Sequence, residues 1–130
     1  MIHALWIIDR SGKIVFFKSY LGEEIKSEIV GGLLTAIQTF ASDVSEEGVS
    51  YVLLENKLFT YKISRGEYFV LCTDEKEDVG QVLEKIEEAY ASGGNREELA
   101  EEVDKVIKKY NREKELESLS KILHRVENII

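Results

Sequence analysis

Few residues in this 130-residue sequence are of types that commonly bind metals or form covalent intermediates. His3 and His124 are the only histidines, and Cys72 is the only cysteine. The three lie far apart in the sequence and show no spacing typical of a zinc site. Cys72 stands between Leu71 and Thr73 in an apolar run without a neighbouring base. We therefore interpret it as a small buried hydrophobic residue and not as a nucleophile.

Carboxylates cluster at Asp74, Glu75, Glu77 and Asp78. We expect them to begin a helix, where the helix dipole stabilises negative charge. They lack the ligand order of a calcium-binding loop, with its central glycine and final glutamate. The cluster therefore predicts a helix start and not a metal site.

Two glycine pairs raise the question of phosphate binding. Gly31-Gly32 lies within an expected helix, and no Gly-Lys-Ser/Thr follows it. Gly93-Gly94 precedes acidic residues that would repel an anion. Two interpretations of the first pair stay open, namely close packing of the helix backbone on a sheet, which we favour, and a hinge or point of ligand approach. The sequence predicts no catalytic residue, no metal site and no cofactor.

The composition excludes several classes of function. A net charge of −8 and a pI near 4.9 argue against a nucleic-acid-binding protein and against an electrostatic grip on anionic lipid. A single cysteine suits a reducing compartment. Without a recognisable signal peptide or membrane-length apolar stretch, we expect a cytoplasmic protein, and peripheral attachment to membranes through a partner stays open. The absence of proline and the abundance of Glu and Lys are typical of a thermophile.

The elements that would position any site follow from periodicity. The run 2–8 is apolar on both sides, with Trp6 and Ile8 pointing one way and Leu5 and Ile7 the other, so both faces of this strand should be covered. We expect a strand, a strand, a helix, three strands joined by short hairpins, and a helix, over 2–8, 14–20, 23–43, 49–54, 58–63, 67–73 and 79–90. We expect the core to include Leu5, Trp6, Ile7, Phe16, Leu33, Ile37, Phe40, Leu53, Tyr61, Val70 and Leu83.

Residues 96–130 carry two further helical patterns. One apolar seam ends at Tyr110 and the next begins at Leu116, a step of six that breaks the heptad phase. We therefore expect a kink or break near Asn111, and a domain at 1–91 followed by a helical extension at 92–130. An isolated helix of 112–130 would be marginal in water, so we expect it to pack on its own domain in the free protein and to be displaceable by a partner.

The first 91 residues resemble a longin domain. The resemblance rests on the opening Met1–Ile14, on the helical Leu33–Ala41, and on Tyr61 followed by Tyr68–Leu71. It implies an α+β fold, a five-stranded antiparallel sheet with helices on both faces in a longin/profilin-like α-β-α sandwich. Longin domains are non-catalytic and bind small GTPases, helical peptides, membrane-trafficking partners or one another, and the related roadblock domains regulate GTPases as dimers. A role as a membrane-fusion SNARE is not expected, because the seam is broken and Arg125 lies outside it.

The sequence thus favours a non-catalytic longin-type protein-interaction module. The resemblance implies a small GTPase, a longin/roadblock-type protein or a membrane-trafficking assembly as its partner, with homodimerisation open. A small-ligand sensor with a profilin- or PAS-like fold is the alternative, and an enzyme on that scaffold is disfavoured by the missing catalytic set. Longin-like proteins bind partners through the first helix and the neighbouring edge strand at 49–54, and the apolar seam of the last helix offers a second surface. The expected partner-binding residues on these elements are Ile29, Gly32, Thr35, Val49, Tyr51, Leu53, Leu116, Leu119, Leu123 and Val126.

Overall fold

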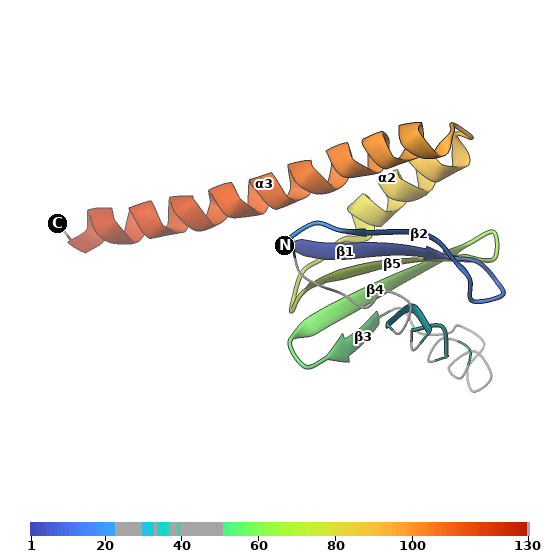
Figure 1. The fold of residues 1–130 in the computed structure, drawn as a ribbon. Helices are drawn as coiled ribbons and strands as arrows, with labels where there is room; N and C mark the ends of the chain where they lie inside the picture. Colours follow the sequence, from blue (N-terminus) through green and yellow to red (C-terminus); the bar gives the residue numbers. More distant parts are fainter. Residues whose placement is uncertain (23–29, 33, 37–38, 40–50, 130) are drawn as a thin grey trace.

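The computed structural model describes residues 1–22, 30–32, 34–36, 39 and 51–129. Its strands and helices follow the expected order along the chain (Figure 1). Residues 30–32 and 34–36 are helical and belong to the expected first helix. The bounded elements are β1 (Ile2–Ile8), β2 (Ile14–Ser19), β3 (Tyr51–Leu54), β4 (Lys57–Ser64), β5 (Glu67–Asp74), α2 (Gly80–Ala91) and α3 (Arg96–Ile129).

The five strands form one antiparallel sheet in the order β2-β1-β5-β4-β3. Two-residue turns join β3 to β4 and β4 to β5, since Leu54 pairs with Lys57 and Ser64 with Glu67. Arg65 and Gly66 in the second turn both have positive φ, 51° and 80°, as the tight turns that match strand twist require. The five-stranded antiparallel sheet is confirmed, and β1 lies near its centre with neighbours on both sides.

Each face of the sheet carries its own hydrophobic cluster. Leu5 and Ile7 of β1 pack with Phe69 and Leu71 of β5 beneath α2 and α3. On the opposite face, Trp6 and other side chains of the sheet pack against Leu34 of the first helix. Helices therefore cover both faces, as expected from the apolar character of β1 on its two sides.

Most expected core residues that the structure describes are buried, namely Leu5, Trp6, Ile7, Tyr61, Val70 and Leu83. Phe16 is half-buried against the α2 side. Leu53 is a wrong prediction, because 53% of it is exposed on the edge strand β3, beyond the part of the sheet that α2 covers. Leu33, Ile37 and Phe40 lie outside the described residues.

The expected break near Asn111 is wrong, because α3 is one helix of 34 residues from Arg96 to Ile129. Asn95 caps its start by accepting a hydrogen bond from the amide of Glu98 at 2.9 Å. Val103 and Ile107 on its first half are fully buried in the core. The change of phase after Tyr110 marks the point where the helix leaves the domain, so its later apolar residues need not share the packed face.

Residues 112–129 of α3, here called the tail, extend past the sheet (Figure 1). Its large apolar side chains are exposed: Leu116, Leu119, Ile122, Leu123 and Val126 keep 47–63% of their surface in solvent. The expected packing of this segment on its own domain is therefore wrong. A continuous helix cannot turn back onto the sheet, and no described element lies beneath the tail to receive it.

Candidate interaction surface

The outer edge of β3 is open among the described strands. β3 is the last strand in the sheet order, and Tyr51 and Leu53 are 63% and 53% exposed. The two-residue turn makes Leu54 and Lys57 the hydrogen-bonded pair that closes the hairpin. Because bonding alternates along an antiparallel ladder, the backbone groups of Tyr51 and Leu53 face away from β4. An edge of this kind can accept an added strand.

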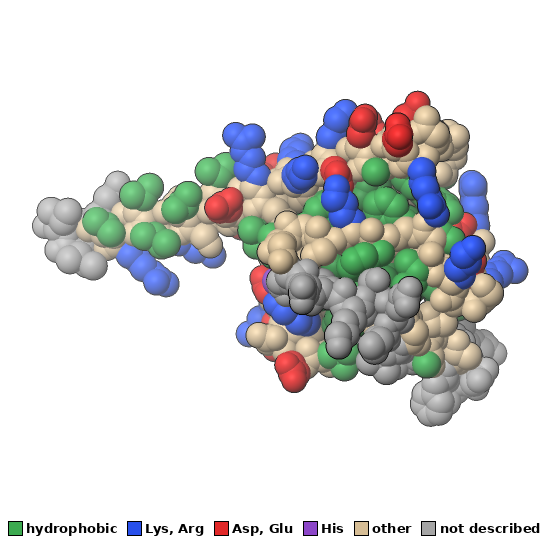
Figure 2. All heavy atoms as spheres, viewed as in Figure 1, with side chains coloured by type: hydrophobic (Ala, Val, Ile, Leu, Met, Phe, Trp, Pro, Cys, Tyr) green, Lys and Arg blue, Asp and Glu red, His purple; other side chains and the backbone are tan. Residues whose placement is uncertain are grey.

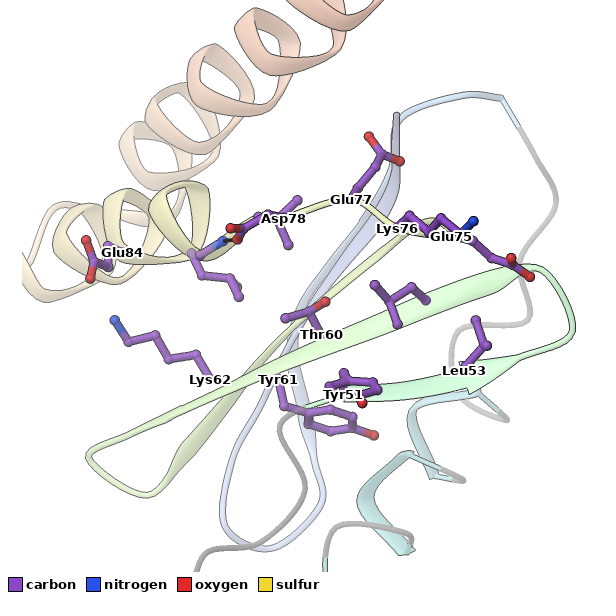
Figure 3. Close-up of a pocket in the computed structure, with 14 residues that line it drawn as sticks. Tyr51, Leu53, Thr60, Tyr61, Lys62, Glu75, Lys76, Glu77, Asp78 and Glu84 are labelled. Atoms are coloured by element: carbon purple, nitrogen blue, oxygen red, sulfur yellow. Dashed lines mark hydrogen bonds between the residues drawn. The ribbon is translucent and has the colours of Figure 1, made fainter.

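A groove of about 660 Å³ lies beside this edge, between the α2-facing side of β3 and β4 and the segment that leads into α2 (Figure 3). Its floor is largely apolar, and its far wall is the polar stretch 75–78. The lining residues are Tyr51, Leu53, Leu58, Thr60, Tyr61, Lys62, Glu75, Lys76, Glu77, Asp78, Val79, Gly80, Leu83 and Glu84.

The groove is acidic, since four carboxylates and two lysines line it. Lys62 already forms an ion pair of 2.7 Å with Glu87, a residue outside the groove, and the hydrogen bond to Glu87 raises the pKa of Lys62. The carboxylates of Glu75 and Glu84 are exposed at the two ends of the wall (Figure 3). The electrostatic potential in the groove is therefore negative, and the floor of the groove is largely apolar.

The acidic cluster does not begin a helix, contrary to the prediction. Asp74 ends β5, Lys76 has a positive φ of 65°, and α2 starts at Gly80 with no acidic residue in its first turn. The physical reason is that tertiary partners take the carboxylates. Glu77 accepts hydrogen bonds from the Met1 amino group at 2.6 Å and from the Tyr110 hydroxyl at 2.8 Å.

Glu77 thereby links the groove to the base of the tail. Burial, followed by the hydrogen bond to Glu77, raises the pKa of Tyr110, so its hydroxyl stays a neutral donor. In the next position, Asn111 bonds both backbone groups of Ile2: its Oδ1 accepts from the amide at 2.6 Å and its Nδ2 donates to the carbonyl at 3.0 Å. These contacts fix where α3 leaves the sheet.

Asp74 is the centre of a charged network at the same end of the sheet. Its Oδ1 lies 2.8 Å from Nε2 of His3 and 3.4 Å from Nζ of Lys57, and its Oδ2 lies 3.3 Å from the Met1 amino group. Burial raises the pKa of Asp74, but the hydrogen bonds from His3 and the Met1 amino group outweigh it and lower the pKa from 3.8 to about 2. His3 is thus held by this network, with its Nε2 atom also 3.1 Å from Nζ of Lys57.

The lowered pKa of Asp74 predicts an acid-dependent loss of stability. The ionised carboxylate stabilises the fold above pH 4, and this contribution disappears as the pH falls from about 4 to about 2. Because 51% of the Asp74 side chain is exposed, solvent screening limits the effect to about 1 kcal/mol. Chemical denaturation at several pH values should show a shallower decline for Asp74→Asn than for the parent. Glu101→Gln, at an exposed position of α3, is the control and should keep the parent slope.

The described part of the expected partner-binding set lies in three places. Tyr51 and Leu53 lie on the open edge, and Leu116, Leu119, Leu123 and Val126 lie on the tail. Gly32 is exposed on the first helix, and Thr35 is half-buried there, with its Oγ1 donating to the carbonyl of Gly31 at 2.9 Å. Ile29 and Val49 lie outside the described residues. Partner binding by these residues stays a prediction.

Sequence reasoning missed the groove and Ile122. Ile122 stands directly before Leu123 and widens the tail's apolar stripe, which its spacing of three from Leu119 could have revealed. The groove had no local signal, because it depends on where α2 lies across the sheet. Within the described ranges, no group of three or more His, Cys, Asp or Glu is placed to hold a metal ion. No helix in that part of the chain combines the length and apolar character of a membrane span.

Comparison with known proteins identifies the fold. No protein-family model matches the sequence, and no curated protein matches it. MglB of Myxococcus xanthus superposes with a TM-score of 0.53 at 10% identity, over 83% of this chain and 85% of that one. A structure described as MglB with tetrameric arrangement gives 0.50 at 18% identity, over 81% and 79%. A roadblock/LC7 domain from Streptomyces avermitilis gives 0.48 at 10% identity, over 85% and 83%.

At such low identities the likeness shows the fold alone. The order of elements, the antiparallel five-stranded sheet and the long last helix agree with it. The chain therefore has an α+β fold of the longin/roadblock type.

Proposed function

We propose that this protein is a non-catalytic interaction module that binds a protein partner along the open edge of β3. The observation that carries the proposal is the backbone of Tyr51 and Leu53, which faces away from β4 at the end of the sheet. The exposed side chains of the same two residues would then give the added strand its specificity. The fold and the resemblance to longin domains support a small GTPase or a component of a membrane-trafficking assembly as the partner.

The packing of the domain favours an interaction module over a small-ligand sensor. A sensor needs an unfilled apolar cavity between the sheet and a helix. Here the described side chains fill that layer: Phe69 packs edge-on against Tyr90 with ring centroids 5.5 Å apart, and Leu71 and Ile86 are fully buried. The groove of about 660 Å³ reaches only the start of α2, at Gly80, Leu83 and Glu84, and it lies at the rim of the sheet beside the exposed edge strand. An exposed apolar surface at the edge of a sheet is typical of a binding site for a protein or a peptide.

Strand addition predicts that a backbone amide, and not only a side chain, determines affinity. Leu53→Pro removes the outward amide and leaves the bonds between β3 and β4 in place, because the Leu53 backbone faces the open edge. We expect affinity for the partner to fall about tenfold or more. Leu53→Ala is the matched control, since it removes the side chain and keeps the amide, and it should cost less.

The experiment begins with capture of partners from a native lysate on the full-length protein, identified by mass spectrometry. Captured small GTPases are then titrated in their GDP and GTP forms by calorimetry against the parent, Leu53→Pro and Leu53→Ala. Equal affinity of the parent and Leu53→Pro would remove the edge of β3 as the site. Failure of every GTPase and trafficking component to bind would remove the proposed partner class.

A further inference from the structure

Two apolar surfaces of this chain lack a cover among the described residues. One is the groove, whose wall on β3 carries the exposed Tyr51 and Leu53. The other is the tail, whose stripe of five large aliphatic side chains recurs at spacings of three and four and faces solvent (Figure 2). A stripe of this width is typical of a helix that packs into a groove.

The tail cannot fill the groove of its own chain. Tyr110 and Asn111 anchor the base of the tail to Glu77 and Ile2, and α3 continues without a break beyond them. The tail's 18 residues then extend for about 27 Å, at 1.5 Å per residue, away from the domain. Reaching the groove beside Glu77 would require breaking the helix next to the anchored residues Tyr110 and Asn111.

The charges of the two surfaces are complementary. Residues 118–129 contain Lys121, Arg125 and one acidic residue, Glu127, so this part of the tail has a net charge of +1, although the chain as a whole has a net charge of −8. Residues 113–117 hold three glutamates and one lysine, so only the distal half of the tail is basic. The groove keeps an excess of carboxylates, because the Met1 amino group pairs with one of its four, Glu77, and Glu87 pairs with one of its two lysines, Lys62. The distal half of the tail is thus the part that an acidic, apolar groove attracts.

We propose that the distal half of the tail lies in the groove of a second copy of this chain, and that the second copy returns the same contact. Glu77 forms part of the groove wall and also holds the base of the tail, so groove and tail base are neighbours. A two-fold axis between two chains can therefore satisfy both contacts at once and closes the assembly as a dimer. A single helix in a groove buries only a part of the area that a stable dimer needs, and the second, symmetric contact doubles that area.

Two full-length variants test the exchange, and both change exposed positions. Leu53→Glu places a carboxylate in the groove and leaves the tail intact. Leu119→Glu/Leu123→Glu spoils the tail stripe and leaves the groove intact, and Leu119 and Leu123 are 51% and 63% exposed, so folding should be unaffected. Thermal melting of each variant checks that point. Sedimentation over a concentration series then measures the dimer dissociation constant of the parent and of each variant alone.

The parent should be a dimer, and each variant alone should dimerise about tenfold or more weakly. Mixing the two variants, with one carrying a fluorescent label, should restore a one-to-one complex, because one supplies the tail and the other the groove. A monomeric parent would overturn the proposal. So would a groove variant that stays dimeric through tail-to-tail pairing, a tail variant that stays dimeric through its sheet edges, or a mixture that does not associate. No foreign partner enters this test, so its failure leaves the proposal of strand addition standing.

Discussion

Replacing Trp6 with alanine is expected to lower the free energy of unfolding by about 3–5 kcal/mol. The side chain is fully buried on the face of the sheet that the first helix covers. Its ring lies 5.1 Å from that of Phe17 on β2 and 6.1 Å from that of Phe59 on β4, centroid to centroid, so it links β1 to the neighbouring β2 and, across β5, to β4. Truncation therefore removes a large buried apolar surface and leaves a cavity that strands on both sides must collapse to fill.

Guanidinium unfolding followed by circular dichroism is the suitable measurement, because Trp6 is the only tryptophan and its fluorescence is lost with it. Lys108→Ala is the control, since this side chain is exposed on α3 outside the tail and its loss should change stability by less than about 0.5 kcal/mol. A loss below about 1 kcal/mol for Trp6→Ala would contradict the burial of this residue at the centre of the sheet.

Much of the fold could be predicted because the sequence of β1 constrains it strongly. A strand without a polar face has to be covered on both sides, which requires helices above and below the sheet. The two short segments after β3 and β4 allow only tight hairpins, and these fix three neighbouring antiparallel strands. Local patterns thus determined the order of elements, the pairing of the last three strands and the two-sided core.

The wrong predictions share a cause. Where one element lies across another, and which distant groups a side chain meets, depends on tertiary packing and not on the local sequence. The alternation of β3 predicts that one of its faces is covered, and Val52 and Leu54 do pack on the first-helix side. Whether α2 also covers the other face depends on where α2 crosses the sheet, and it stops short of Leu53. The acidic stretch 74–78 likewise has the composition of a helix start, but its carboxylates bind the Met1 amino group, His3, Lys57 and Tyr110, which lie far away in sequence.

The candidate surfaces were predictable only in part for the same reason. The apolar stripe of the tail follows from periodicity, and the resemblance to longin domains implies the edge position of β3; the structure describes both. The groove could not be predicted in this way, because residues from β3, β4 and the start of α2 form it together. Its negative field, and the match to the basic distal half of the tail, emerge only once those elements are in place.

Replacing Asn111 with alanine is expected to destabilise the protein by about 1–3 kcal/mol. The Asn111 amide bonds both the N–H and the carbonyl of Ile2, a residue that is itself fully buried at the start of β1. Alanine leaves these two backbone groups without that partner in a partly buried position. The intrinsic preference of alanine for the helix works in the opposite direction, by about 0.5 kcal/mol, and offsets only a part of the loss.

The sign of the change separates two explanations of the phase step after Tyr110. If Asn111 were a weak point in the helix, alanine would strengthen α3 and raise the stability. If Asn111 is the residue that pins α3 to β1, alanine lowers the stability and speeds hydrogen exchange at the Ile2 amide. Ser118→Ala, at an exposed position of the tail, reports the helix-propensity effect alone and should be neutral or slightly stabilising. An Asn111→Ala variant as stable as Ser118→Ala would mean that the two hydrogen bonds to Ile2 do not hold the helix on the sheet, and the fixed direction of the tail would then lose its physical basis.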